Sequence, residues 1–151
     1  MEVVPQGGEG IKMRKPLIAP RVAVGAVVID HHKILLVKRK KDPGKGLWAI
    51  PGGSVKLGET LQKAAEGEIR EETGLIVKAK DPIYTFDVIE RENRKIRFHY
   101  VIVDLMADLM GGKLRPSDDA LDARWFRAQE IQEFEVSERT RDFLEKFGFI
   151  R

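Results

Sequence analysis

The stretch that decides the fold runs from Gly53 to Leu75 and reads GSVKLGETLQKAAEGEIREETGL. Its second half has the apolar spacing of an amphipathic helix, which we predict over Thr60 to Thr73, with Gly74 placed to end it. One stripe of that helix is small or aliphatic and is expected to face the core: Leu61, Ala64, Ala65 and Ile69.

Carboxylates crowd the same side of the predicted helix. Glu68 and Glu72 fall inside the apolar stripe and Glu71 lies at its edge, whereas Lys63, Glu66 and Arg70 occupy the opposite face, which we expect to be solvated. Like charges at this spacing destabilise a helix, and an unpaired buried carboxylate costs more. Divalent cations relieve both costs, and an oxygen-only donor set suits Mg²⁺ or Mn²⁺. The alternative is an ordinary solvated charged face.

The flanking residues favour the metal hypothesis. Gly52 and Gly53 precede the helix on a tight loop, where backbone carbonyls can reach an ion, and Glu59 adds a carboxylate at the helix entrance. The whole segment resembles the Nudix box, G-x5-E-x7-R-E-U-x-E-E-x-G-U, in which U is a bulky aliphatic residue. It departs from that pattern at one defined position, because Gly67 stands where the family has arginine. On the wheel such an arginine would lie near Glu71.

The resemblance implies an α/β fold, a Nudix-type α/β/α sandwich with a mixed sheet between helices. It also implies a pyrophosphohydrolase that cleaves a nucleoside diphosphate linked to another group, with Mg²⁺ as cofactor and Mn²⁺ as a substitute. Carried over position by position, Glu68, Glu71 and Glu72 would bind the metal with a backbone carbonyl of Gly52 or Gly53. Glu71, Glu72 and Glu59 would serve catalysis, Glu59 by supporting the loop or an outer metal shell.

Residues outside the box complete the expected site. Asp119 is the leading candidate for the general base and Asp118 the alternate, although a solvated loop explains either equally well. Arg39 is expected to bind substrate phosphates through its planar guanidinium. Gly53 is assigned to substrate binding as well, and Phe86 is a candidate for stacking on the base, as are Phe98 and Tyr100. Aromatic residues on strands are more often part of the core.

The remaining segments alternate in a way that suits a mixed sheet with helices packed on it. Strands are predicted over Arg21 to Asp30, Lys33 to Lys38, Trp48 to Ile50, Ile76 to Glu90, Lys95 to Ala107 and Ala123 to Phe126. His31 and His32 are expected at a hairpin tip rather than in a metal site. Gly111 and Gly112 are expected to break the chain, and Ser137 to cap a last helix that ends at Phe147.

Composition limits the partners. Among 151 residues the net charge is +3 with 34% charged side chains, which favours anionic small molecules over nucleic acid. There is no cysteine and no long apolar run, so we expect a cytoplasmic protein that makes no contact with a membrane. Residues 1–20 are predicted to be a flexible segment and residues 21–151 the Nudix domain. A homodimer is a further hypothesis.

The substrate is a small nucleotide, and ADP-ribose, cleaved to AMP and ribose 5-phosphate, is the first choice. The aromatic strand around Tyr100 and the loop leading to Trp125 resemble small ADP-ribose pyrophosphatases, but a proline that many of them share is replaced by Glu90. Two alternatives stay open. One is a MutT-like nucleoside triphosphate pyrophosphatase acting on oxidised or noncanonical nucleotides. The other is a non-catalytic nucleotide-binding domain, which only Gly67 favours.

Overall fold

A computed structural model describes residues 19–42, 44–115 and 120–151. The strands and helices follow one another in the order β1 (Arg21–Asp30), β2 (Lys33–Arg39), β3 (Trp48–Ala49), β4 (Gly52–Ser54), α1 (Leu61–Thr73), β5 (Leu75–Glu92), β6 (Lys95–Gly112), β7 (Ala120–Arg127), the 3₁₀ helix η2 (Ala128–Glu133) and α2 (Glu138–Phe147). No described helix has the length and apolar character that a bilayer crossing requires.

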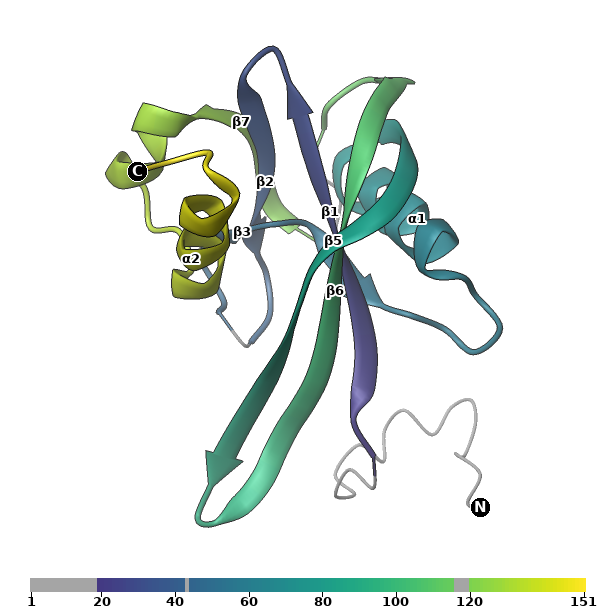
Figure 1. The fold of residues 1–151 in the computed structure, drawn as a ribbon, viewed down its shortest axis with the longest axis vertical. Coiled ribbons are helices and arrows are strands. Elements are labelled where there is room, and N and C mark those ends of the chain that lie inside the picture. Colours follow the sequence, from purple (N-terminus) through teal and green to yellow (C-terminus); the bar gives the residue numbers. More distant parts are fainter. Residues whose placement is uncertain (1–18, 43, 116–119) are drawn as a thin grey trace.

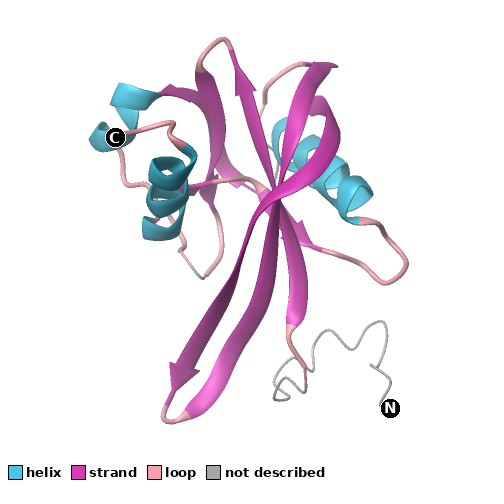
Figure 2. Ribbon diagram, viewed as in Figure 1, coloured by secondary structure: helices cyan, strands magenta, loops and turns pink. Residues whose placement is uncertain are grey.

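The strands form one mixed sheet in which β1 is central. Its order is β3-β2-β1-β6-β5, with β4 added beside β1 and β7 beside β2 (Figure 2). β1 runs parallel to β6, with Arg21 opposite Tyr100, and antiparallel to β2 and β4. The turn between β1 and β2 consists of His31 and His32, both with positive φ, as the hairpin prediction requires.

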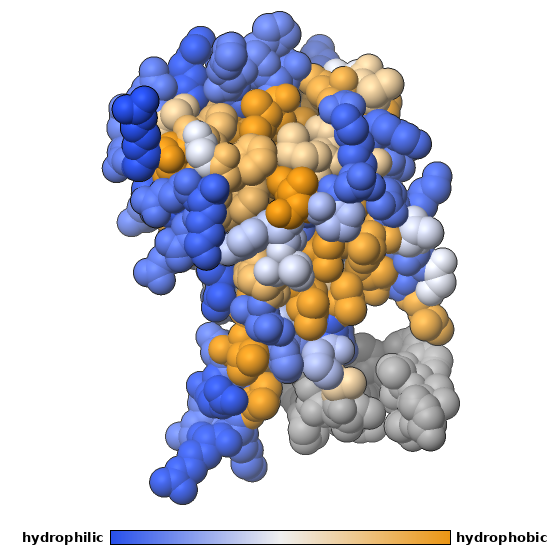
Figure 3. Space-filling model, in the orientation of Figure 1, coloured by the Kyte–Doolittle hydropathy of each residue, from blue (hydrophilic) through white to orange (hydrophobic). Residues whose placement is uncertain are grey.

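A helix covers each face of the sheet, which confirms the predicted α/β/α sandwich (Figure 1). On one face α1 buries Ala64, Ala65 and Ile69 against alternate residues of β1, β5 and β6. On the other, α2 buries Phe143 and Leu144 in a second cluster with Trp48, Phe126 and Ile131. Apolar side chains gather along the middle of the face shown in Figure 3, over the strands between the two helices, with polar residues at the margins.

Local capping explains where α1 begins and ends. Thr60 is the N-cap, and its side chain accepts a hydrogen bond from the backbone N–H of Lys63 at 3.1 Å. Gly74 ends the helix in the left-handed conformation, with φ of 79°, and donates its N–H to the carbonyl of Arg70. Both ends lie where the sequence predicts them.

β5 and β6 are longer than predicted and form an arm that extends beyond the body of the domain (Figure 1). Gly111 and Gly112 do not break the chain, because they still pair with Ile76 and Leu75 at the end of β6. Gly112 has φ of 88°, and a Cβ there would lie 2.6 Å from the carbonyl oxygen of Gly74. Gly112 therefore allows β6 to pass close to the end of α1.

Replacing Gly112 by alanine should lower the free energy of unfolding by about 1–2 kcal/mol or more, because left-handed backbone and a backbone collision both oppose a Cβ. Gly111→Ala is the matched control, since a Cβ there meets nothing within 4 Å. Urea unfolding of both variants tests this, and equal stabilities would contradict it.

Candidate active site

The carboxylate of Glu68 packs directly against the backbone of Gly53. A Cβ built on Gly53 would lie 2.5 Å from Oε1 and 2.7 Å from Oε2 of Glu68, so a side chain at this position would push the carboxylate out of its present place. Glu68 is partly buried, on the turn of α1 between Ala65 and Ile69. Gly53 therefore lets the helix carboxylate lie directly against the β4 backbone.

A hydrogen bond joins the next turn of α1 to the same strand. The N–H of Gly52 donates to Oε1 of Glu72 at 3.1 Å, and Glu72 is also partly buried. β4 is held in place by antiparallel pairing with β1, in which Gly52 faces Gly25 and Gly53 faces Val24. Two of the three predicted carboxylate ligands, Glu68 and Glu72, thus meet both loop glycines at one place.

The third helix carboxylate stands apart from this meeting point. Glu71 is exposed, at the edge of the stripe as the helical wheel predicts. Within the described ranges no set of three or more His, Asp or Glu side chains is grouped closely enough to hold an ion. The donor set nevertheless fits a hard divalent cation, because Glu68 and Glu72 supply carboxylate oxygens beside backbone that a Cβ would obstruct.

Glu59 shapes the loop between β4 and α1. Its Oε1 accepts the N–H of Lys56 at 2.9 Å, and its own N–H donates to the carbonyl of Lys56 at 2.9 Å. These bonds close a tight turn just before the N-cap of α1. Glu59 therefore holds the backbone of the loop that leads into α1.

Glu66 departs from its predicted position on the solvated face. It is partly buried, and its Oε2 accepts the N–H of Ala79 at 2.9 Å. Ala79 lies at a register shift between β5 and β6, where the ladder is interrupted and this N–H is available. The carboxylate of Glu66 therefore attaches α1 to β5, which the helical wheel alone does not reveal.

Gly67 lies on the helix in open space. A Cβ added there meets nothing within 4 Å, so the packing does not require glycine at this position. Packing around this position therefore does not explain why the chain departs from the box pattern here.

The candidates outside the box lie on separate elements. Arg39 is partly buried at the end of β2, where its backbone bonds with Gly46 and Leu47 close the loop that leads to β3. Phe86 is a partly buried residue of β5, opposite Ile102, and its ring lies 5.4 Å from that of Tyr84. Asp118 and Asp119 lie outside the described residues.

Sequence reasoning missed a buried acid, Asp104 on β6. Its exposed fraction is 3%, and burial raises its pKa from 3.8 to about 7. A Cβ on the neighbouring Gly25 would overlap Oδ1 of Asp104, so the carboxyl occupies the room left by that glycine. The available signal was a single acidic residue within the apolar run VIVDLMA.

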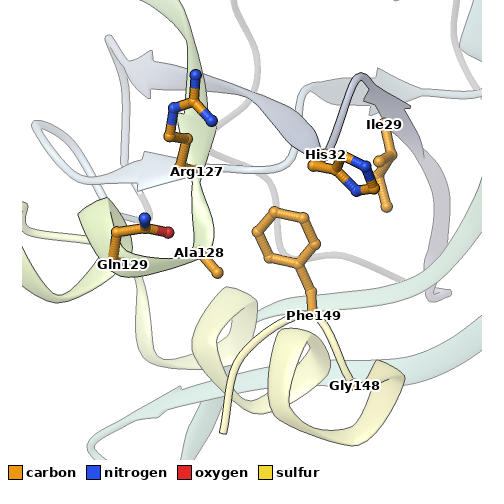
Figure 4. Close-up of a pocket in the computed structure, with 7 residues that line it drawn as sticks. All are labelled: Ile29, His32, Arg127, Ala128, Gln129, Gly148 and Phe149. Atoms are coloured by element: carbon orange, nitrogen blue, oxygen red, sulfur yellow. The ribbon is translucent and has the colours of Figure 1, made fainter.

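One cavity of about 360 Å³ lies away from these acids (Figure 4). It sits between the β1–β2 turn, η2 and the C-terminal segment, with the Phe149 ring between His32 and Ala128. Its lining holds no carboxylate: Ile29, His32, Arg127, Ala128, Gln129, Gly148 and Phe149. It is therefore not part of the site on α1 and β4.

Comparison with known proteins identifies the family of this chain. Residues 19–147 match the family model described as the NUDIX domain. The chain belongs to the Nudix hydrolase family. It is accordingly a hydrolase that acts on pyrophosphate bonds, and α1 with the preceding loop is its Nudix box.

Three relatives illustrate the range within the family. An ADP-ribose pyrophosphatase from Methanocaldococcus jannaschii is 40% identical over 116 residues, which cover 77% of this chain and 67% of that protein. A MutT NUDIX hydrolase from Burkholderia pseudomallei shares 30% identity with a TM-score of 0.69, covering 84% and 97% of the two chains. A bifunctional NMN adenylyltransferase/ADP ribose pyrophosphatase from Francisella tularensis, complexed with AMP and Mn ion, shares 26% identity with a TM-score of 0.64, covering 91% of this chain and 44% of that one. The chain spans 30% and 41% of the lengths of two longer curated relatives.

Gly67→Ala should stabilise this Nudix domain by about 1 kcal/mol, because alanine is the better helix former and the site is open. Thermal unfolding and urea titration measure the effect. A loss of stability would show that Gly67 has a packing role that the structure does not display.

Asp104 should make stability depend on pH. Its raised pKa means that the folded protein keeps a proton which the unfolded chain releases, so the contribution of Asp104 to stability is fully present below pH 3.8 and is lost as the pH rises through about 7. Between about pH 5 and about pH 8 the loss should be on the order of 2 kcal/mol. Asp104→Asn should remove that part of the slope in urea titrations. Identical slopes for the two proteins would contradict the assignment.

Proposed function

We propose that this Nudix enzyme is a Mg²⁺-dependent ADP-ribose pyrophosphatase that releases AMP and ribose 5-phosphate. The observation that carries the chemistry is the contact of Glu68 and Glu72 with Gly53 and Gly52, which puts carboxylates and a bare backbone side by side. The choice of substrate is supported by the 40% identity to an ADP-ribose pyrophosphatase.

Glu68, Glu71 and Glu72 would hold the metal together with a backbone carbonyl of Gly52 or Gly53. A bound divalent ion neutralises charge on the phosphate oxygens and lowers the pKa of a coordinated water. Support comes from the oxygen-only donor set and from the relative complexed with AMP and Mn ion. Glu71 is exposed and so is free to turn toward the other two carboxylates.

In the reaction a water oxygen forms a bond to one phosphorus of the pyrophosphate, and the bond from that phosphorus to the bridging oxygen breaks. The bridging oxygen leaves on the other phosphate, and the water proton passes to a general base. Asp119 is the proposed base and Asp118 the alternate, on the segment that precedes β7. Arg39 is proposed to hold a phosphate as a charge-assisted donor. Phe86 is proposed to contact the nucleobase of the substrate.

The second candidate is hydrolysis of nucleoside triphosphates. It is favoured by the likeness to a MutT NUDIX hydrolase, which is 30% identical. Both activities would use the same carboxylates on α1, so only the products distinguish them. ADP-ribose gives AMP and ribose 5-phosphate, whereas a triphosphate gives a monophosphate and pyrophosphate.

Glu72→Gln should reduce metal-dependent hydrolysis of ADP-ribose by about a hundredfold or more, because a neutral amide is a poorer ligand for a hard cation. Chromatography of the products formed with Mg²⁺ or with EDTA measures the loss. EDTA should abolish turnover by the unmodified enzyme.

Glu66→Gln is the matched control on the same helix. An amide oxygen can still accept the N–H of Ala79, so this variant should keep its activity. Equal activity of the Glu72 variant and the unmodified enzyme would overturn the assignment of Glu72. Turnover of triphosphates but not of ADP-ribose would move the substrate to the second candidate.

A further inference from the structure

Asp104 is a buried acid with no apparent use in the fold. Only 3% of its surface is exposed, and among the described residues no hydrogen bond or ion pair to its carboxyl is found. A buried polar group without a hydrogen-bond partner costs free energy, so Asp104 lowers the stability of the domain. This points to a functional use that its packing does not supply.

The neighbours of Asp104 place it on the face of β5 and β6 that carries the aromatic side chains. In the strand register Asp104 lies opposite Tyr84 and Gly25, and two residues further along Ile102 lies opposite Phe86. Because side chains alternate along a strand, these residues share one face. The Tyr84 ring lies 5.4 Å from that of Phe86 and 5.1 Å from that of Phe143 on α2.

The same position adjoins the Nudix loop. Gly25, whose missing side chain leaves the room for the Asp104 carboxyl, pairs with Gly52, and Gly52 donates its N–H to Glu72. Ile50, just before the loop, is the other side chain near Gly25, at 3.2 Å from where a Cβ would lie. Ile50 and Tyr84 are only partly buried, so the side chains next to the acid reach the surface, where a planar ligand can contact them.

We propose that Asp104 is a specificity-determining residue that hydrogen-bonds the amino edge of the adenine base while the pyrophosphate lies at the Nudix loop. The proposal rests on the proposed function, since it assigns the base of that substrate to this face. Aromatic rings beside the acid supply the surface on which a base stacks. The acid supplies what stacking lacks, a directional contact that distinguishes one base from another.

The chemistry of the carboxyl matches adenine. Adenine presents an N6 amino donor beside a ring-nitrogen acceptor. A protonated carboxyl offers a C=O acceptor beside an O–H donor, which is the complementary pair. Burial favours this neutral form of Asp104. On the same side, the Nζ of Lys146 lies 3.4 Å from the Tyr84 hydroxyl.

The test measures binding, so that it does not depend on turnover. Isothermal titration with AMP and with ribose 5-phosphate, both in Mg²⁺ buffer, gives the contribution of the base as the ratio of the two affinities. Asp104→Leu should lower the affinity for AMP about tenfold and leave that for ribose 5-phosphate unchanged. Asp104→Asn should retain the preference for AMP, because an amide also pairs bidentately with adenine.

Two controls separate recognition from folding. Asp108→Asn changes an exposed acid of the same strand, which pairs with Lys80 at 3.2 Å, and should leave both affinities unchanged. Thermal unfolding shows whether the leucine variant folds; if it does not, the asparagine variant and GMP carry the test. An asparagine variant that loses the preference for AMP, or a protein that binds GMP as tightly as AMP, would overturn the proposal. If AMP binds as expected but ADP-ribose is not cleaved, the proposed function fails while the role of Asp104 stands.

Discussion

The contact between the Glu68 carboxylate and the Gly53 backbone is the constraint on which the rest of the site depends. It depends on a residue without a side chain at 53, which leaves the carboxylate its present place, on a helix with its acids on the inner side, and on alanines that let the helix lie close to the sheet. Pairing of β4 with β1 then holds the glycine loop against the central strand. Removing any of these elements would separate the acids from the backbone, so the 23-residue box works as one structural unit with the sheet.

Much of this could be predicted from the chain alone, because the information is local. The apolar period of α1, its threonine cap and its terminal glycine are all set within a few residues, and the spacing of the acids in the box follows from helix geometry. The turn at His31 and His32 is equally local. Agreement is therefore best for α1 and for the first hairpin.

Features that depend on distant partners could not be read in the same way. Glu66 lies on the face that the wheel assigns to solvent, yet an interrupted ladder in β5 gives it an N–H to accept. Gly111 and Gly112 look like a chain break, whereas both pair with β5 and the close passage of β6 past Gly74 requires glycine at 112. Asp104 is likewise a single acidic residue in an apolar run of the sequence. Its neighbours Gly25 and Tyr84 are known only from the strand register. The order of the segments indicates the layers, but it does not give the register.

The position of β1 between β2 and β6 also bears on how the domain folds. β5 and β6 are neighbours in the chain and pair along nearly their full lengths, so their hairpin can form from local contacts. The parallel ladder that joins Arg21 to Tyr100 closes a loop containing the whole Nudix box, and loop closure of this size costs chain entropy before it brings any contact. The docking of β1 on this hairpin is thus the expected slow step, and because β4 pairs with β1, the same step brings the glycine loop toward the acids of α1.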